Sequence, residues 1–424
     1  MQIYRYPLFK SWPDITRRPS ADNSDKVETV REVMSKIRED GDAAIREYTS
    51  QFDHVDIEDF TVIADEIKAA VRKIDPELKN AINIAARNID TFHVAQKVPH
   101  RVIETMPGVK CWQKSVPIDR VGLYIPGGSA PLFSTVLMLG IPAMIAGCRN
   151  VILCTPPDHN GDIHPAILYA ASICHITEIY KIGGMQAIGA MAYGTESIQK
   201  VDKIFGPGNS WVTAAKQFVA MADCAIDMPA GPSEVAVMAD ETANPAFVAA
   251  DLLSQAEHGP DSQVIMVTTN EKLIHSVIKV MGQQLKELPR ATTAAKALDN
   301  SRAILVTDVE EMLGLINFYA PEHLIIATKD AAALAERITN AGSVFIGNYS
   351  PESAGDYASG TNHTLPTNGW AKSFSGIGLD SFCKKITFQE ITHDGIMLLG
   401  PVIEQMAEAE QLFAHKNAAT LRMQ

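Results

Sequence analysis

The sequence predicts an α/β protein with two doubly wound, Rossmann-like domains, one inserted in the other, together with small N-terminal and helical C-terminal segments. Two observations support this fold class. Short apolar runs, typical of strands buried on both faces, alternate with longer segments whose apolar residues recur at helical spacing. In the middle of the chain, glycine-rich turns separate the strands from the helices that follow them.

The region before residue 120 is expected to be mainly helical. Segments 27–52 and 76–96 carry apolar residues at helical spacing, and we expect them to pack on the later of the two sheets. The first twenty or so residues contain no sustained apolar stretch and no small-residue cleavage site. We therefore expect no export signal and a cytoplasmic protein.

The first series of strand, turn and helix begins near residue 120. It comprises the segments "RVGLYIPGGSAP", "NVILCTPP", "EIYKIGGMQAIGAMAYG" and "KIFGPGNSWVTAAKQF". Its glycine turns at 126–128, 183–184 and 206–208 follow strands, and ligands of open α/β sheets bind at the carboxyl ends of strands. These turns favour a nucleotide cleft. No GxGxxG or GxxxxGK[ST] motif is present, so the glycines could equally serve only to make tight turns.

The apolar segment 130–148 lies within this series. It is about as long as a membrane span must be, but Gly140 and Pro142 interrupt it and strand-like runs flank it. We expect a buried helix here and no membrane association.

The second series covers residues 234–347, where apolar runs again alternate with segments of helical spacing. The strand rhythm ends near residue 375, and an amphipathic helix at 400–421 closes the chain. The expected units are an N-terminal segment, 1–22; a discontinuous main domain, 23–123 and 235–375; an inserted domain, 124–234; and a C-terminal tail, 376–424.

Net charge bears on the classes of partner, and cysteine content bears on the compartment. The 424-residue chain has 37 Lys+Arg against 50 Asp+Glu, a net charge of -13, which disfavours nucleic acid and anionic membranes. Its six cysteines form no CxxC pair, and several lie in apolar runs, which suggests a reducing compartment.

The helix "AFVAADLLSQAEH" ends in polar side chains although most of its surface is apolar. Gln255 and His258 are three residues apart, so both lie on one face of its last turn. From this spacing alone, an idle polar patch and half of a metal site both remain open.

Three other polar clusters occur after this helix. Glu322 and His323 lie side by side at the start of a strand, where a solvated surface pair is the simpler interpretation. Asp356 and His363 lie in a long Gly/Ser-rich loop, together with Asn362, and such loops are commonly functional. Glu410 and His415 lie on the last helix, about 140° apart, and should face different partners. Together the clusters supply nitrogen and oxygen ligands suited to zinc or another divalent ion: Gln255, His258, Asp356 and His415.

Several motifs are similar to those of the histidinol dehydrogenases. They are "YIPGG", "FGPGN", "MPAGPSE", "LLSQAEHGPDSQ", "PEHL", "SAGDYASGTNHTLPT" and "AEAEQLFAHKNA", and they extend over nearly the whole chain. The resemblance implies one Zn²⁺ per subunit, for which Mn²⁺ or Co²⁺ can substitute. Its implied metal ligands are Gln255, His258, Asp356 and His415.

The resemblance also implies roles for other residues. Glu322 and His323 become the catalytic pair, and the dinucleotide contacts fall on Tyr124, Gln186 and Asn209. The implied substrate contacts are Ser233, Gln255, His258, His323, Asp356, His363, Glu410 and His415. The implied reaction is the oxidation of L-histidinol through L-histidinal to L-histidine with two NAD⁺. The implied assembly is an intertwined homodimer in which the tail of one chain brings Glu410 and His415 to the active site of the other.

Two alternatives stay open. A related zinc and NAD dehydrogenase of another small alcohol would keep the metal set and the "PEH" motif, but need not keep His363 and Glu410. A zinc hydrolase could use a metal beside Glu322 to activate water, but it leaves the three glycine turns unexplained.

Overall fold

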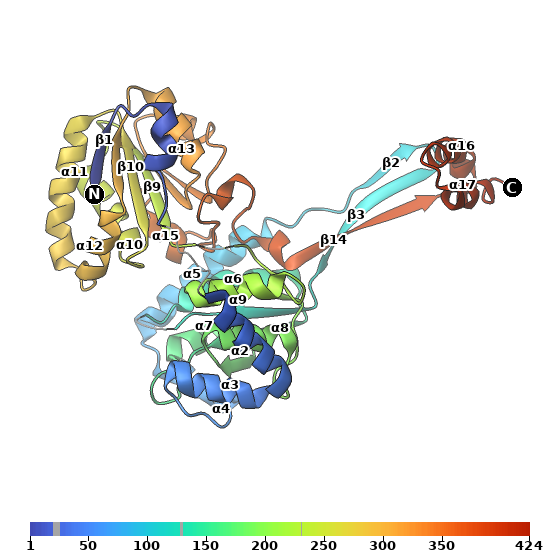
Figure 1. Ribbon diagram of the computed structural model, residues 1–424, viewed down its shortest axis with the longest axis horizontal. Helices are drawn as coiled ribbons and strands as arrows, with labels where there is room; N and C mark the ends of the chain where they lie inside the picture. The colour runs from blue at the N-terminus through green and yellow to red at the C-terminus, as the bar shows by residue number, and fades with distance from the viewer. Residues whose placement is uncertain (20–25, 128–129, 230) are drawn as a thin grey trace.

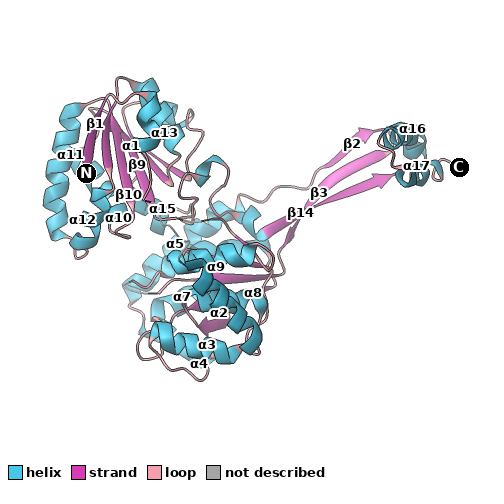
Figure 2. Cartoon of the chain, viewed as in Figure 1, coloured by secondary structure: helices cyan, strands magenta, loops and turns pink. Residues whose placement is uncertain are grey.

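The computed structural model describes residues 1–19, 26–127, 130–229 and 231–424, and shows two α/β units and a long arm (Figure 1). Helices cover both faces of the two parallel sheets, whereas the strands of the arm lie apart from the rest (Figure 2). The expected boundary at residue 22 and Gly128 of the first glycine turn lie outside the described residues.

The later unit contains a six-stranded parallel sheet of order β1-β11-β10-β9-β12-β13. Its strands are β1 (Gln2–Arg5), β9 (Glu234–Ala239), β10 (Gln263–Thr268), β11 (Arg302–Leu305), β12 (His323–Ala327) and β13 (Ser343–Ile346). Its helices are α1 (Trp12–Ile15), α10 (Pro245–Ala256), α11 (Glu271–Gln284), α12 (Ala291–Asp299), α13 (Val309–Tyr319), α14 (Ala331–Ala335) and α15 (Glu352–Tyr357). The N-terminal segment is thus an edge strand and a short helix of this unit.

The earlier unit contains a five-stranded parallel sheet of order β6-β5-β4-β7-β8. Its strands are β4 (Arg120–Tyr124), β5 (Asn150–Thr155), β6 (Glu178–Lys181), β7 (Lys203–Phe205) and β8 (Ala225–Ile226). The helices between them are α6 (Phe133–Ala146), α7 (Pro165–Ile173), α8 (Gly184–Tyr193) and α9 (Ser210–Ala220). The strand order reverses between β4 and β7, which makes this pair the switch point of the sheet. Both series of strands and helices are confirmed.

The helices before residue 120 pack on the earlier sheet, so our expectation that they cover the later one is wrong. They are α2 (Lys26–Asp40), α3 (Asp42–Tyr48), α4 (Ala64–Lys73) and α5 (Pro76–Val94). Helix α5 contacts α6, α4 contacts α7, and α2 contacts α8 and α9. The physical reason is that α10–α12 and α1, α13 and α14 already cover the two apolar faces of the later sheet.

The arm is an antiparallel ribbon of order β14-β3-β2 that leads to a pair of helices. Its elements are β2 (Val102–Met106), β3 (Val109–Pro117), β14 (Cys383–Ile391), α16 (His393–Ala409) and α17 (Phe413–Thr420). The sequence predicted neither the strands before 120 nor a strand after 375. Their residues are mostly exposed, so no buried run or buried face marked them in the sequence.

Our expectation of a single helix at 400–421 is also wrong. Gln411 has φ +60°, a left-handed conformation that ends the helical run between α16 and α17. Glu410 therefore directly follows α16, and His415 lies on α17.

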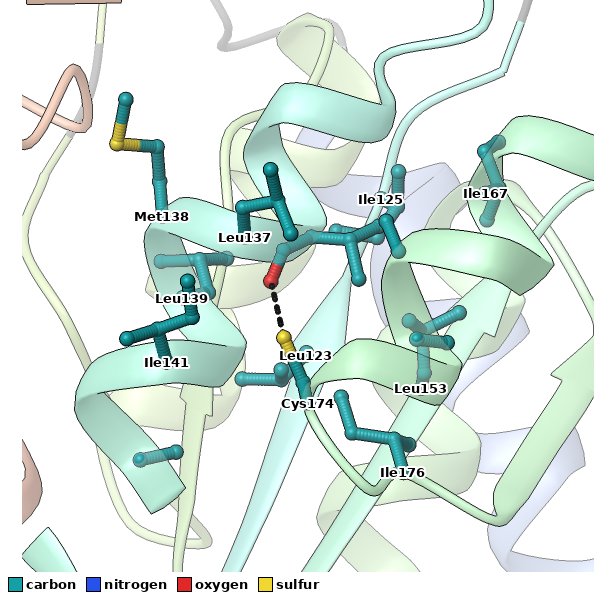
Figure 3. Close-up of a cluster of buried hydrophobic side chains, with 14 of the residues drawn as sticks. Leu123, Ile125, Leu137, Met138, Leu139, Ile141, Leu153, Ile167, Cys174 and Ile176 are labelled. Carbon is teal, nitrogen blue, oxygen red and sulfur yellow. Dashed lines mark hydrogen bonds between the residues drawn. The ribbon is translucent and has the colours of Figure 1, made fainter. Parts of the chain in front are cut away.

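The apolar segment 130–148 forms α6, as expected, in the core of the earlier unit (Figure 3). Leu137 of α6 and Leu123 of β4 are buried, and the Cys174 thiol donates to the Val136 carbonyl at 3.7 Å. No helix in the described ranges is long and apolar enough to cross a membrane. All six cysteines lie in the described part of the chain, and each is a free thiol.

Candidate active site

A cluster of buried polar side chains lies at the amino ends of β9 and β12. His323 is the first residue of β12 and pairs in register with Val235 of β9, so Glu322 and Glu234 lie beside each other at the same sheet edge. Gln255 reaches this edge from the last turn of α10. Glu322 and His323 are both buried. The interpretation of Glu322 and His323 as a solvated surface pair is therefore wrong.

The main chain of Glu234 holds three of the predicted site residues. Its N–H donates to Glu322 Oε2 at 2.8 Å, and its carbonyl accepts from Gln255 Nε2 at 3.1 Å. Nδ1 of His323 lies 3.1 Å from the same carbonyl oxygen. In the neutral ring this contact places the proton on Nδ1 and the lone pair on Nε2. Nε2 of His323 faces Asp356 Oδ1 at 3.4 Å.

The donor set fits a divalent cation. Ligand atoms of His258, Glu352 and Asp356 lie within 4.8 Å of one another. Gln255 Oε1 is buried without a hydrogen-bond partner, and so are both carboxylate oxygens of Glu352. Buried oxygens that accept no hydrogen bond are costly unless a ligand satisfies them, and imidazole and carboxylate suit zinc. The interpretation of the α10 terminus as an idle polar patch is thus the weaker one.

The electrostatics of the cluster follow from burial and crowding. Burial raises the pKa of Glu322 to about 8. Burial alone would lower the pKa of His323, but three neighbouring carboxyls raise it to about 10. These carboxyls belong to Glu352, Glu322 and Asp356. Desolvation also lowers the pKa of His258, although its ring reaches solvent, and a neutral imidazole is the form that binds metals.

His363 joins the cluster to the earlier unit. Its Nδ1 lies 2.9 Å from the Asp356 carbonyl oxygen, and its Nε2 lies 3.1 Å from the hydroxyl of Thr135 on α6. Asn362 donates to the Met138 carbonyl of the same helix at 2.6 Å. The loop after α15 therefore connects the two units at the site. Ser233 directly precedes β9 and is half-buried.

A large pocket lies at the carboxyl ends of β4–β7 in the earlier unit. It has a volume of about 1220 Å³, and its lining includes the three predicted dinucleotide contacts, Tyr124, Gln186 and Asn209. The Gly184 N–H donates to the Tyr124 hydroxyl at 3.1 Å, and Gln186 Nε2 donates to Asp53 at 2.9 Å. Asn209 caps α9 through its side-chain oxygen. The structure thus brings residues that flank three separate glycine turns to one cavity.

Comparisons with known proteins cover the whole chain. Residues 16–423 match the family model of histidinol dehydrogenase. A histidinol dehydrogenase of Bacteroides thetaiotaomicron is 59% identical over 423 residues, which is 100% of this chain and 99% of that protein. One of Escherichia coli O6:H1 is 53% identical and covers 96% of this chain and 93% of its own length. The crystal structure of histidinol dehydrogenase from Elizabethkingia anophelis has a TM-score of 0.98 at 56% identity, covering 100% of this chain and 98% of that one.

The chain belongs to the histidinol dehydrogenase family. This membership makes it an oxidoreductase of histidine biosynthesis. An acetylating aldehyde dehydrogenase from Geobacillus thermoglucosidasius has a TM-score of 0.50 at 15% identity, covering 89% of this chain and 93% of that one. That likeness concerns the fold alone.

In this member of the histidinol dehydrogenase family, the two predicted tail residues lie apart from the rest of the site. Glu410 and His415 are exposed, and α16 and α17 lie at the far end of the arm, remote from α10 and α15 (Figure 1). Within one chain the structure does not bring these two residues to the cluster.

Sequence reasoning missed four residues of this histidinol dehydrogenase site. Glu352 lies four residues before Asp356 on α15, and this helical spacing could have revealed it. Glu234 follows Ser233 within the "AGPSE" motif. Arg18, which pairs with Glu234, and Asp53, which pairs with Gln186, lie far from their partners in the sequence, so no local pattern identifies them.

Proposed function

We propose that this chain catalyses the NAD-linked oxidation of L-histidinol through L-histidinal to L-histidine, with one zinc ion in each active site. The observation that carries the proposal is the placement of His323 among buried carboxyls and unsatisfied oxygens, joined through the His363 loop to the unit that holds the dinucleotide-sized pocket. The family match names this substrate for the relatives.

Gln255, His258 and Asp356 would hold the metal, and Glu352 lies close enough to add a ligand. His415 from a second copy of the chain would complete the set. When bound, zinc would fix the imidazole and amino nitrogens of the substrate and offset part of the negative charge that the carboxyls place around His323. Ser233 and His363 of the same chain, together with Glu410 of the second copy, would hold the rest of the substrate.

His323 would take the hydroxyl proton of the alcohol in the first oxidation, and NAD⁺ in the pocket would be the hydride acceptor. The neutral ring needed for this step keeps its proton on Nδ1, against the Glu234 carbonyl, and offers Nε2 as the base. In the described structure Nε2 faces Asp356 Oδ1 at 3.4 Å, and the surrounding carboxyls favour the protonated ring. A bound cation would offset part of this negative charge and favour the neutral ring, with Nε2 as the base.

Glu322 would take a proton from the water that hydrates the aldehyde before the second oxidation. One of its oxygens accepts from the Glu234 N–H, which fixes the carboxyl and leaves the other oxygen for water. The raised pKa, about 8, makes the ionised carboxylate a stronger base than an exposed one.

We also propose a homodimer with shared sites in the cytoplasm. The arm displays apolar side chains, among them Leu398 at 52% and Met406 at 61% exposure, that a partner would cover. The free thiols suit a reducing compartment.

The test is the appearance of NADH absorbance when metal-loaded protein is mixed with histidinol and NAD⁺. We expect two NADH per histidinol. Turnover of other primary alcohols in preference to histidinol would favour the related dehydrogenase, and amide cleavage without NADH would favour the hydrolase. No NADH from any alcohol would overturn the proposal.

A further inference from the structure

A buried ion pair lies behind the glycine turn that follows β7. The side chains of Lys216 on α9 and Asp227 after β8 are 5% and 1% exposed, and Nζ lies 2.5 Å from Oδ1. Neither residue lines the pocket at the carboxyl ends of β4–β7. A buried pair of charges carries a desolvation cost that an apolar pair would avoid, so its retention calls for a local reason.

The pair binds both polar main-chain groups of Gly206, its carbonyl and its N–H. Lys216 Nζ donates to the Gly206 carbonyl at 2.7 Å, and the Gly206 N–H donates to Asp227 Oδ2 at 2.8 Å. The Met228 N–H donates to Asp227 Oδ1 at 2.8 Å. The charges are therefore neutralised by each other and anchored to the main chain just after β7 and just after β8.

Gly206 connects this pair to the pocket. It has φ +127°, and a Cβ there would lie 2.0 Å from the Tyr124 carbonyl oxygen, so the turn presses against the end of β4. Three residues further on, Asn209 lines the pocket and caps α9. A shift of Gly206 would consequently move the groups that line the cavity from both strands of the switch point, Tyr124 and Asn209.

We infer that Lys216 and Asp227 are positioning residues for dinucleotide binding, which they serve by fixing the Gly206 turn and, through it, Tyr124 and Asn209. This inference rests on the proposed NAD function. It assigns the pair no contact with NAD or substrate. The buried polar cluster around His323 lies in the later unit, whereas the pair lies in the earlier one. The pair should therefore influence dinucleotide binding and leave histidinol binding unchanged.

The experiment compares the wild type with Lys216→Met, Asp227→Asn and the double variant Lys216→Met/Asp227→Asn, each as the metal-loaded full chain. The double variant leaves no uncompensated buried charge, so it should fold even where a single variant does not. We expect its Kd for NAD⁺, measured by calorimetric titration, to rise on the order of tenfold, because displaced Tyr124 and Asn209 would lose part of their contact with the dinucleotide. Its KM for NAD⁺ should rise in parallel, with KM for histidinol unchanged.

Lys203→Met is the matched control. Lys203 is a half-buried lysine of β7 that donates to the Ser381 carbonyl, and its charge acts on Asp227 without a hydrogen bond to it. Its loss therefore removes a nearby positive charge while both hydrogen bonds of the pair to Gly206 stay in place. It should leave the Kd for NAD⁺ at the wild-type value. A folded double variant with a wild-type Kd would overturn the inference, and so would an equal rise of Kd in Lys203→Met. A wild type that binds no NAD⁺ would instead refute the proposed function.

Discussion

At the scale of single residues, Glu234 organises the site through both its main chain and its side chain. The main chain binds Glu322, Gln255 and His323, as described above. The carboxylate receives Nε and Nη2 of Arg18 at 2.5 and 2.8 Å. The N-terminal segment thereby fixes the strand end on which the proposed catalytic pair depends, although no site motif lies in that segment.

Removing Arg18 should destabilise the protein and slow the reaction. Arg18→Met leaves the buried Glu234 carboxylate without its counter-ion, so we expect unfolding free energy to fall by about 3–5 kcal/mol. Denaturant unfolding measures this loss, and kcat should fall with it. Arg17→Met, at an exposed pair with Asp14, should change neither quantity. If Arg18→Met/Glu234→Gln were no more stable than Arg18→Met, the unpaired charge would not be the cause.

The two members of the catalytic pair should differ in the half-reactions they serve. Glu322→Gln should impair oxidation of added histidinal far more than the first oxidation of histidinol, because it removes the base for water. His323→Asn should suppress the first oxidation as well. Single-turnover measurements on each substrate separate the steps. Equal losses in both half-reactions for both variants would contradict this division.

Asp53 should make stability depend on pH. Burial raises the pKa of this carboxyl to about 6 in the folded chain, above its ordinary value of 3.8. The folded state therefore binds more protons between these values, and its stability falls as pH rises from about 4 to about 6. Asp53→Asn keeps an acceptor for Gln186 and should equal the wild type near pH 4. Near pH 7 it should be more stable by about 1–2 kcal/mol, after allowance for partial exposure. Thermal melts across this range measure the difference, and a constant difference would contradict the assignment.

At the scale of elements, the sequence predicted what is buried and missed what is exposed. The strands of both parallel sheets are apolar runs, as β9 and β10 show, so their composition predicts their burial. The arm strands β2 and β14 have no such signature because solvent reaches both faces. The packing of α2–α5 depended on which sheet had an uncovered face, and spacing within a helix does not contain that information.

The same distinction applies to the site. Gln255 and His258 are three residues apart, and Glu322 and His323 are neighbours, so local spacing indicated both pairs, although α10 ends at Ala256 and His258 lies just beyond it. That Asp356 would meet them required the family resemblance, since the chain between them crosses several strands. Arg18 and Asp53 act across 216 and 133 residues of sequence respectively, and only the folded structure places them beside their partners.

Helix α15 supplies Asp356 and Glu352 to the proposed metal, and metal removal should separate function from folding. Chelation should abolish activity and leave far-UV circular dichroism nearly unchanged, because two large parallel-sheet cores do not depend on the site. Glu352→Gln should weaken metal affinity by about 10–100-fold, measured by competition with a chromogenic chelator. Glu257→Gln, beside His258 but outside the cluster, is the matched control. Full activity of metal-free protein would contradict the site.

At the scale of the whole molecule, the arm is the feature that one chain does not explain. Its ribbon is long and exposed, and its terminal helices have little core of their own; Ala419 is the one buried residue of α17. Apolar side chains such as Phe413 at 60% exposure need cover. A symmetric dimer would cover both arms at once. It would also bring Glu410 and His415 of each chain to the proposed active site of the other chain.

Mixed dimers test whether the sites are shared. Glu322→Gln disables the body of a chain, and His415→Ala disables its tail, so each homodimer should be nearly inactive. If tails are exchanged, a mixed dimer has one site in which the intact body of the His415→Ala chain meets the intact tail of the Glu322→Gln chain, while its other site carries both defects. If each tail instead folds onto its own body, every site keeps one defect. Co-refolding the two variants should therefore restore activity toward one working site per mixed dimer, measured as NADH formed from histidinol, with mixed dimers counted by native mass spectrometry. A mixture that contains mixed dimers and stays as inactive as its parents would show that the tail serves its own chain.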